Sequence, residues 1–501
     1  MMKQKTVDFG RLSRRIDELA EKWDTSGSLV MLADDRVVHR KTYGFADREK
    51  NIAMSDDDTY LISARSRMLL GLCMMQLMDR RKVSLRGTLD KYIPEYPHAP
   101  RVTVRQLLHH STGIADYFYG GKMVQLSRSE QHQALGDEDR FRVECYAYVS
   151  PITFTEALAI IADAPLEFEP GSRSNAWSAS NIIFLQEIIE RVSGLSLVDY
   201  QRKQIFEPLG MNETRPGWDA TTVSYGCIKE TVLVRLPVVE PIDHALKTTV
   251  SDLEKFMRGV VNGQLMSRRA WKTALSYDEE GAGIVAENAN GIACGEGGLL
   301  GYEFNLYFDQ DRKMGYIHMT NELQIQRRIG DEWLYFRKEM RQAVEEETTY
   351  PAFTRLEPYS QKNAWHAMSL AIAESQRSFV LDAKSSLCYA LAKPKVRRPY
   401  VLMEGRRAVG LMVLLIDRKK ADYCVDIFLV DKKYQNRGFG KVMLSEGLEI
   451  LKRNGARRIE IGVNRFNVAA QKLYFSLGFE PAAVYEQGMW LRIDLDKGGQ
   501  S

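Results

Sequence analysis

The segment from Val425 to Lys441 constrains the fold of this chain more than any other stretch of its 501 residues. It begins as an apolar run, crosses a short polar turn and reaches two close glycines, Gly438 and Gly440, where a helix is expected. Chain that enters a helix in this way directs several unpaired backbone N–H groups at one point, and glycine lets a ligand approach closely. The helix dipole also favours negative charge there, so the segment predicts an anion-binding turn. A purely structural turn is the alternative, because Gln-x-x-Gly-x-Gly is neither the Walker loop nor the dinucleotide fingerprint.

The length of the chain predicts two or three domains, and a hydrophobic content of 45% supports large cores. Lys and Arg number 69 against 66 for Asp and Glu, which gives no reason to expect a nucleic-acid partner. No apolar run has bilayer length, and the polar start of the chain lacks the apolar core of a signal peptide, so no membrane partner is expected. The six cysteines are scattered, which predicts reduced thiols in a cytoplasmic protein and no metal site.

An acidic, proline-terminated stretch at 345–352 predicts a linker, which divides the chain into domains at 1–344 and 353–501. In the first domain, alternating residues around Asp34 and Asp35 predict a hairpin over 27–44. Apolar spacing predicts a buried helix from about Ser66 to Arg81, and a closing helix from about Ile329 to Ala343.

Two segments of the first domain are specific: Leu107-Leu108-His109-His110-Ser111-Thr112-Gly113 and Pro208-Leu209-Gly210-Met211. With their neighbours, in this order, they resemble the serine β-lactamase and penicillin-binding-protein-like superfamily, in its class C and esterase branch. The resemblance spans about Gly27 to Met340. It implies a sheet flanked by helices with an inserted all-α subdomain.

The catalytic motifs of that superfamily are degenerate in this chain. Its Ser-x-x-Lys motif falls on Ala64 and Arg67, and alanine has no nucleophilic atom while arginine stays protonated. Its Tyr-Ser-Asn motif falls on Ala176-Trp177-Ser178, without the tyrosine. Its third motif, a His or Lys beside glycines, falls on Gly295-Glu296-Gly297-Gly298, with an acid in that place. The resemblance therefore predicts a catalytically dead hydrolase domain that binds, dimerises or regulates.

Two serines close to Ala64 leave a second hypothesis for this domain, that of an active hydrolase. Ser63 and Ser66 are close in the sequence, but a register shifted to Ser63 would pair it with Ser66 and not with a lysine. A hydrolase or peptidase with an atypical site is thus the competing hypothesis for this domain.

The second domain predicts a strand at 353–356, a helix at 361–374, a hairpin within 399–416, a strand at 423–430, a helix from Gly438 to about Asn454, a strand at 458–463 and a helix capped by Asn467. The opening segment together with Asn467-x-x-Ala470-x-x-Leu473-Tyr474 and Gly478-Phe479 resembles the GNAT superfamily of N-acetyltransferases. The resemblance covers about Phe353 to Leu495. It implies a mixed, splayed sheet, so the whole chain is expected to be a two-domain α/β protein, and it implies acetyl-CoA as the acetyl donor.

The resemblance assigns roles to residues of the second domain. The backbone of Phe428 to Val430 would pair with the pantetheine arm, and the amides from Gln435 to Lys441 would hold the pyrophosphate. Acetylating an amine requires a neutral amine, a stabilised oxyanion and a protonated leaving thiolate. The implied acid is Tyr474 and the implied base is Asp426; their structural alternatives are a packed aromatic and a strand-edge charge. The implied acetyl-CoA-binding residues are Phe428, Leu429, Val430, Gln435, Asn436, Arg437, Gly438, Phe439, Gly440, Lys441 and Asn467.

Shorter segments at 376–380, 385–387, 398–400 and 408–412 look like the bacterial spermine/spermidine acetyltransferase branch. The chain departs from that branch at Cys424-Val425-Asp426-Ile427, which puts spermidine itself in doubt. We therefore expect an N-acetyltransferase for a polyamine or another amine-bearing small molecule, such as an antibiotic. A non-catalytic protein that senses acetyl-CoA stays an alternative, and a homodimer stays open.

Overall fold

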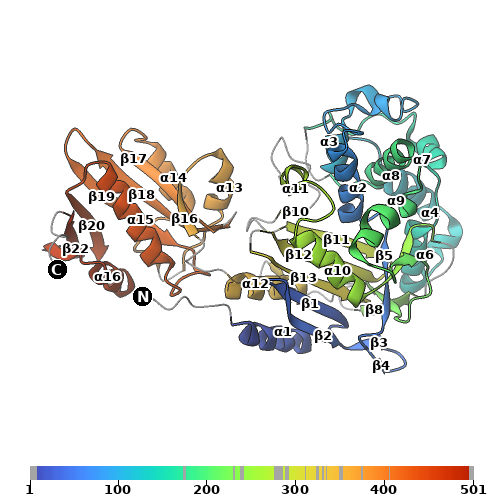
Figure 1. Cartoon of the computed structure of the whole chain (residues 1–501), viewed down its shortest axis with the longest axis horizontal. Helices are drawn as coiled ribbons and strands as arrows, with labels where there is room; N and C mark the ends of the chain where they lie inside the picture. Colours follow the sequence, from blue (N-terminus) through green and yellow to red (C-terminus); the bar gives the residue numbers. More distant parts are fainter. Residues whose placement is uncertain are drawn as a thin grey trace. The chain divides into compact units, whose positions relative to one another are not determined.

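A computed structural model of the chain describes residues 8–172, 176–228, 232–236, 242–275, 286–287, 293–310, 312–322, 327–329, 332–334, 336–348, 354–373, 376–404 and 407–495. The chain forms two compact units (Figure 1). One comprises Phe9–Glu287 with Ala293–Arg341, and Gln342–Ser501 is the main part of the other. The division falls between Arg341 and Gln342, close to the domain boundary predicted at 344.

The first unit is built on a six-stranded antiparallel sheet with the order β10-β11-β12-β13-β1-β2. Its strands are β10 (Ala286–Glu287), β11 (Ala293–Leu299), β12 (Tyr302–Asp309), β13 (Met314–Thr320), β1 (Gly27–Ala33) and β2 (Arg36–Tyr43). The predicted hairpin is confirmed, because β1 and β2 pair across Asp34 and Asp35, both of which have positive φ. Smaller sheets join β3 (Phe45–Asp47) to β4 (Ile52–Ala53), β5 (Thr59–Ser63) to β9 (Ala245–Thr249) and β6 (Arg215–Pro216), β7 (Ser224–Ile228) to β8 (Val232–Leu236), and β14 (Arg327–Ile329) to β15 (Glu332–Leu334).

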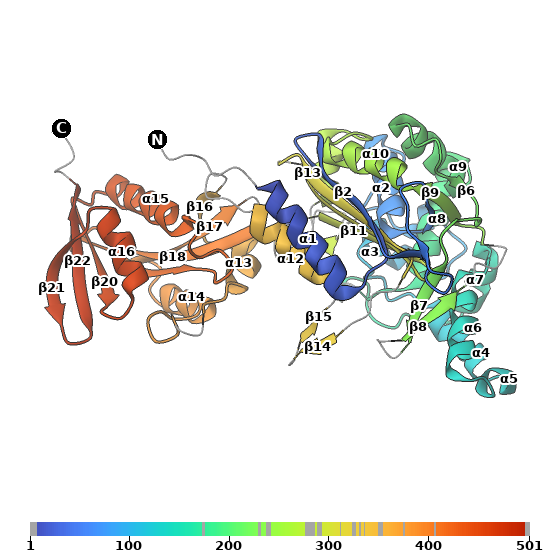
Figure 2. The same ribbon diagram turned by 90° about the horizontal axis from the view of Figure 1, so that it is seen from below.

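Helices cover both faces of this sheet (Figures 1 and 2). On one face, α10 approaches β13 at Gly315, where a Cβ atom would lie 2.9 Å from Val261 Cγ2. On the other face, α1 is joined to α12 by a 2.7 Å hydrogen bond from Trp23 Nε1 to Glu339 Oε2. The helices are α1 (Phe9–Trp23), α2 (Arg67–Asp79), α3 (Val104–Leu108), α4 (Met123–Ser127), α5 (Glu130–Gln133), α6 (Asp137–Val149), α7 (Phe154–Ile161), α8 (Ala179–Ser193), α9 (Leu197–Gln201), α10 (Val250–Val261), α11 (Arg268–Leu275) and α12 (Phe336–Thr348).

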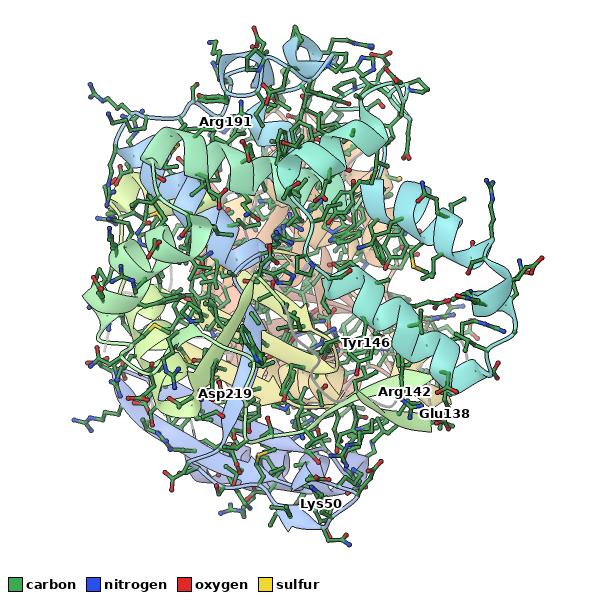
Figure 3. All side chains as sticks on the ribbon, turned by 90° about the vertical axis from the view of Figure 1, so that its right-hand side faces the viewer. Lys50, Glu138, Arg142, Tyr146, Arg191 and Asp219 are labelled. Carbon is green, nitrogen blue, oxygen red and sulfur yellow. The ribbon has the colours of Figure 1, made fainter. Side chains whose placement is uncertain are left out.

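The expected α subdomain is the run of helices from α2 to α9, which the chain inserts between β5 and β6. Figure 3 shows Glu138, Arg142 and Tyr146 along α6 at its surface. The buried helix predicted over 66–81 is confirmed as α2, in which ten consecutive residues from Met68 to Leu77 are buried.

Two predictions around the domain boundary were wrong. The helix expected from Ile329 begins only at Phe336, because 327–329 and 332–334 pair as the hairpin of β14 and β15. The same helix continues to Thr348, so the first four residues of the predicted linker, 345–348, are helical. Residues 349–352 of the predicted linker lie outside the described residues.

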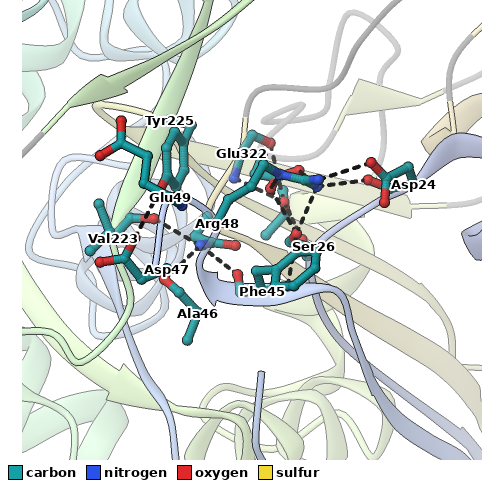
Figure 4. Close-up of polar contacts among 12 residues, drawn as sticks. Asp24, Ser26, Phe45, Ala46, Asp47, Arg48, Glu49, Val223, Tyr225 and Glu322 are labelled. Atoms are coloured by element: carbon teal, nitrogen blue, oxygen red, sulfur yellow. Dashed lines mark hydrogen bonds and ion pairs between the residues drawn. The ribbon is translucent and has the colours of Figure 1, made fainter. Parts of the chain in front are cut away.

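A buried polar network fixes the chain after β2 to the end of the central sheet (Figure 4). Glu322 is 5% exposed and accepts hydrogen bonds from Ser26 Oγ at 2.7 Å and from Arg48 Nε at 2.8 Å. Arg48 also pairs with Asp24 at 2.9 Å. Because burial removes water from Glu322, its partners depend on it for their hydrogen bonds.

The second unit contains a seven-stranded mixed sheet with the order β16-β17-β18-β19-β20-β22-β21. Its strands are β16 (Thr354–Pro358), β17 (Arg397–Glu404), β18 (Arg407–Asp417), β19 (Asp422–Val430), β20 (Arg458–Asn464), β21 (Glu480–Tyr485) and β22 (Gly488–Asp494), and its helices are α13 (Gln361–Met368), α14 (Ala383–Leu391), α15 (Phe439–Arg453) and α16 (Val468–Ser476). Helix α13 ends at Met368, earlier than the predicted Glu374. Alternate residues of β18 serve two cores: Leu411 packs with residues of α13 and α14, and Met412 with residues of α15.

In the part of the chain that the structure describes, no helix is both long and apolar enough to span a bilayer.

Replacing Glu322 with Ala should lower the free energy of unfolding of the first unit by about 2 kcal/mol, because Ser26 and Arg48 lose a shared buried acceptor. Urea unfolding of the full chain measures this. Glu138→Ala is the matched control: Glu138 pairs with Arg142 at the surface of α6, so its loss should cost less than about 1 kcal/mol. Equal destabilisation by both substitutions would contradict the role given to Glu322.

Candidate functional site

A cleft of the second unit opens where β19 and β20 separate. These two parallel strands share a single register pair, Cys424 with Glu460, and then diverge. Beyond that pair, residues 425–430 of β19 and 461–464 of β20 line opposite walls of a cleft of about 580 Å³. A strand edge without a neighbour offers backbone donors and acceptors to a ligand. The splayed sheet expected from the sequence is therefore present, and its opening lies beside the segment that begins at Val425.

Only alternate residues of β19 turn their backbone groups to this opening. Asp431 N–H donates to Val409 of β18 at 3.0 Å, and the register pairs Leu429 with Leu411. Strand alternation then turns Leu429 toward β18 and leaves Phe428 and Val430 on the open edge. Of the three residues predicted to pair with a pantetheine arm, the backbone groups of Phe428 and Val430 face the cleft edge and those of Leu429 do not.

The glycine-bearing turn leads into α15 as predicted. Gly438 is the residue before the helix and has φ 91°, a left-handed conformation that suits glycine. The amides of Lys441 and Val442 donate to the carbonyl of Gly438 at 3.1 and 3.3 Å, so they close the first helical turn. The preceding amides, from 435 to 440, are the ones this arrangement offers to an anion. No acidic residue stands in the first turn of α15, and Lys441 lines the cleft.

The residues that the sequence predicted to bind acetyl-CoA do not all line the cleft. Gln435, Asn436, Gly438, Gly440, Lys441 and Asn467 line the cleft. Phe439 is fully buried and packs on Tyr434 with ring centroids 5.9 Å apart, so its side chain holds the helix start to the core. Arg437 is half-buried and is not among the residues that line the cleft. The predicted cap is confirmed, since Asn467 Oδ1 accepts from Ala470 N–H at 3.2 Å.

A loop that includes the segment 376–380, to which the sequence assigned no site role, completes one wall. Gln435 and Gln376 exchange side-chain hydrogen bonds at 2.8 and 3.2 Å, and Gln435 Nε2 also donates to the carbonyl of Val430 at 2.9 Å. Asp431 accepts from Ala371 N–H at 2.7 Å. These bonds fasten the loop to the end of β19, and they place Gln376, Phe379, Val380 and Leu381 in the lining of the cleft.

Asp426 occupies a β-bulge and is engaged by two partners. The pairing of β18 with β19 shifts register there, so that Val413 and Leu414 oppose Ile427 and Val425. The Asp426 carboxylate accepts from Arg397 Nε at 2.9 Å and from the Tyr389 hydroxyl at 3.3 Å. Arg397 also donates to that hydroxyl, and its guanidinium lies 3.6 Å from the centroid of the Tyr389 ring. Asp426 thus lines the cleft as a member of an ion-paired cluster, which the sequence analysis did not foresee.

Tyr474 of α16 lies in the wall of the cleft, beside Phe428 of the bulged strand. It is 5% exposed, lines the cleft and packs edge-on against Phe428, with ring centroids 6.2 Å apart. Burial raises the pKa of Tyr474 above its ordinary value, and the Cys424 thiol nearby adds to the effect. The phenol therefore stays protonated through neutral pH and is available as a proton donor.

The Cys424 thiol stands where the two strands part. Burial, and then the neighbouring Asp426, raise the pKa of the Cys424 thiol to about 12. At neutral pH this thiol is protonated, so it is a poor nucleophile.

A second, smaller cavity lies in the first unit. About 160 Å³ in volume, it is bounded by Ser66 and Arg67 at the start of α2, by Trp177 and Ala179, and by Gly298 of β11. Residues at or beside the three segments to which the resemblance assigned catalytic motifs therefore line one cavity. Of the segment assigned to the second motif, Trp177 lines the cavity and Ser178 instead caps α8 by accepting from Ser180 N–H at 3.1 Å; Ala179, which follows the segment, also lines the cavity. Ala64 is fully buried, and the side chain of Glu296 lies outside the described residues.

Comparison with models of known protein families identifies both domains. The family model described as Beta-lactamase matches residues 12–337. The chain belongs to the β-lactamase family. The model described as Acetyltransferase (GNAT) family matches residues 365–479, so the C-terminal domain is a GNAT acetyltransferase domain.

Curated relatives match part of the chain. Penicillin-binding protein 4* of Bacillus subtilis is 24% identical over 206 residues, which cover 41% of this chain and 41% of that protein. The teichoic acid D-alanine hydrolase of Staphylococcus aureus is 20% identical over 202 residues, which cover 40% of this chain and 43% of that protein. The chain thus spans less than half the length of these curated relatives.

Among solved structures, the octameric penicillin-binding protein homologue from Pyrococcus abyssi has a TM-score of 0.50 at 18% identity and covers 82% of this chain and 89% of its own. The D-stereospecific amidohydrolase from Streptomyces sp. has a TM-score of 0.51 at 16% identity, with 68% and 98% covered. At this identity the likeness shows the fold alone.

The buried thiol at the cleft gives a direct test of the site's electrostatics. Iodoacetamide at pH 8 should modify the exposed Cys388 more than about tenfold faster than Cys424, because alkylation requires the thiolate. Peptide mass mapping of the full chain over time measures both rates. Comparable rates at the two cysteines would show that Cys424 is neither buried nor protonated in this way.

Proposed function

We propose that this chain is an acetyl-CoA-dependent N-acetyltransferase that acetylates an amine, a polyamine or another amine-bearing small molecule, in the cytoplasm. The observation that carries the proposal is the cleft between β19 and β20, which runs from an open strand edge at Phe428 and Val430 to the N-terminus of α15. Acetyl-CoA carries an extended arm with amide groups, followed by a pyrophosphate. The arm suits the open strand edge, and the pyrophosphate suits the helix N-terminus.

The residues around the cleft fit the proposed acetyl donor. A Cβ atom at Gly440 would lie 3.2 Å from Leu473 Cδ2 and 3.6 Å from Phe428, so a side chain there would crowd the space beside the turn. In the proposal, the amides from 435 to 440 bind the pyrophosphate, Lys441 adds positive charge, and Phe428 and Val430 bind the pantetheine arm. Acetyl-CoA supplies an activated acetyl thioester at the end of this arm.

In the proposal, residues of the chain carry out two proton transfers: one to the sulfur that leaves and one from the amine that attacks. Tyr474 is a neutral phenol in the cleft wall, so its O–H can donate a proton to the leaving sulfur. Asp426 is the predicted acceptor for the proton of the amine. Its carboxylate is held by hydrogen bonds from Arg397 and Tyr389, so in the proposal it orients the amine and accepts the proton directly or through a water molecule.

We further propose that the β-lactamase-like domain does not hydrolyse substrates but binds a ligand, dimerises or regulates. The register that puts Ala64 and Arg67 at the Ser-x-x-Lys positions supports this. One observation favours the competing hydrolase hypothesis: Ser63 Oγ lies 3.0 Å from His244 Nδ1. Burial, and then Arg65, lower the pKa of His244 to about 3. An imidazole with so low a pKa is a weak base for activating a serine at neutral pH.

Tyr474→Phe should reduce kcat for acetylation of an accepted amine by about a hundredfold and leave the KM for acetyl-CoA within about twofold, because only the transferable proton is lost. Thiol release from acetyl-CoA across a panel of polyamines, aminoglycosides and aryl amines first identifies the acceptor and then measures both constants. Tyr485→Phe is the matched control, since Tyr485 is 48% exposed in β21. Binding of acetyl-CoA with no turnover on any amine would favour the acetyl-CoA-sensing alternative.

The full chain should show no covalent labelling by a fluorescent penicillin and no hydrolysis of nitrophenyl esters above the rate of the free buffer. The reason is that Ala64 offers no nucleophile and His244 is a weak base. Labelling and ester assays on the chain and on its Ser63→Ala and Ser66→Ala variants test this. An adduct that disappears in either variant would contradict the proposal and support the hydrolase alternative.

A further inference from the structure

Three surface loops of the second unit meet at the end of its sheet where β19 and β20 begin. The loops are residues 393–398, 417–422 and 452–458, each taken with the helix or strand ends that it joins. Ile416 N–H donates to the carbonyl of Val396 at 2.7 Å, and Arg418 donates to Asn454 Oδ1 at 2.7 Å, so the middle loop contacts both others. Because β17, β18, β19 and β20 are neighbours in the sheet, the loops form one surface about 15 Å wide.

This surface concentrates positive charge. The three loops contain ten exposed Lys and Arg residues and two Asp residues, a formal charge of +8, whereas the whole chain carries only +3. The ten residues, which we call the basic surface, are Lys393, Lys395, Arg398, Arg418, Lys419, Lys420, Lys452, Arg453, Arg457 and Arg458. Counting the four acids that follow or flank the loops, Glu449, Glu460, Asp494 and Asp496, still leaves a charge of +4, so the sign depends on no single residue.

Most of this charge is not compensated by neighbouring side chains. Arg458 pairs with Asp494 at 2.8 Å, and no carboxylate in the described part of the chain forms an ion pair with the other nine. Lys452 and Arg453 also suit the negative end of the α15 dipole, a structural role that the cations of the other two loops do not share. The basic surface therefore presents its charge to the solvent and to any anionic partner.

The other side chains of the loops distinguish between kinds of anionic partner. None of the three loops, all of which the structure describes, contains a large exposed apolar or aromatic side chain. Surfaces that bind a bilayer commonly add apolar side chains that enter it, and surfaces that bind single strands add aromatic rings that stack on bases. Half of the ten cations are arginines, whose planar guanidinium matches a phosphate group. These features favour the phosphate backbone of a nucleic-acid duplex.

From these observations we infer that the basic surface binds the phosphate backbone of double-stranded nucleic acid. A duplex carries a negative charge about every 1.7 Å along its axis, so a surface of this width faces several phosphates at once. The net charge of the whole chain gives no sign of such a partner, because it averages the basic surface with the rest of two domains.

The basic surface is separate from the proposed acetyl-CoA site. Helix α15 has 15 residues, so Arg453 at its end lies about 21 Å from the turn to which the pyrophosphate is assigned. The inference therefore goes beyond the proposed function and does not depend on acetyl transfer.

Fluorescence anisotropy of a labelled duplex of about 20 base pairs, titrated with the full chain, tests the inference. We expect saturable binding with a Kd of about 1 μM at about 50 mM KCl. At about 200 mM KCl the binding should be at least about tenfold weaker, because phosphate contacts release counterions. No saturable binding at the lower salt concentration, or binding that does not weaken with salt, would overturn the inference.

Two competitors separate the duplex from other polyanions. Polyglutamate and vesicles of phosphatidylglycerol with phosphatidylcholine should each displace the duplex at least about tenfold less well than unlabelled duplex, compared at equal charge. The vesicles are included because Leu391, two residues before the first loop, is 49% exposed. Equal displacement by polyglutamate would indicate an acidic protein partner, and better displacement by the vesicles would indicate a membrane; either result would overturn the inference.

Paired substitutions locate the contact. The double variant Lys419→Ala with Arg453→Ala should weaken duplex binding by about tenfold or more and reduce the slope of log K against log salt by about two. Lys82→Ala with Arg86→Ala is the matched control, because it removes one exposed Lys and one exposed Arg from the first unit and should change the affinity less than about twofold. The single variant Lys420→Ala, with a slope reduced by about one, decides the matter if the double variant does not fold. Unchanged affinity in a folded Lys419→Ala/Arg453→Ala variant, or equal weakening by the control, would overturn the inference.

Saturating acetyl-CoA separates this inference from the proposed function. It should leave the Kd of the duplex within about twofold, because the two sites lie at opposite ends of α15. Displacement of the duplex by acetyl-CoA would place the duplex at the turn before α15 and overturn the inference. Duplex binding by a chain that transfers no acetyl group to any amine would overturn the acetyltransferase proposal alone.

Discussion

The separation of β19 from β20 is the constraint on which the C-terminal domain depends. A parallel pair that meets only at Cys424 and Glu460 cannot continue as a sheet, so its two strands become walls. The bulge at Asp426 bends β19 at that point, and the next strand residues turn alternate backbone groups to the opening. The glycine-bearing turn then brings the start of α15 to the end of the same wall. A strand edge and a helix N-terminus thereby line the same cleft.

The two domains differ in the residues at the positions that the resemblances assign to catalysis. In the GNAT domain the turn, the cap residue Asn467 and the buried phenol of Tyr474 are all present around one cleft. In the β-lactamase-like domain, residues of the corresponding segments also line one cavity, and the register that we propose puts Ala64 and Arg67 at the nucleophile and lysine positions. The fold there survives because it rests on the central sheet and on buried networks such as Glu322 with Arg48, which do not involve the motif side chains. We propose that the first domain has exchanged bond cleavage for binding, dimerisation or regulation.

Much of the fold and part of the site could be predicted from the sequence, since apolar periodicity and glycine positions are local signals. The hairpin at Asp34 and Asp35, the buried helix α2 and the strand–turn–helix at Val425 are of this kind. What could not be predicted depends on contacts between distant residues. Arg397 meets Asp426 only because β17 and β19 flank β18, and Gln376 reaches Gln435 only through the loop that Asp431 fastens. The late start of α12 has a similar cause, because pairing between β14 and β15 overrides a helical pattern.

Hydrogen–deuterium exchange of the full chain, with and without acetyl-CoA, tests the central claim most directly, because it reports which amides the acetyl donor covers. We predict slower exchange at Phe428 and Val430 and across 435–440 when acetyl-CoA is bound, with no change at the start of α2. Protection confined to α2 and its cavity, or no protection along β19 and the turn before α15, would contradict the account.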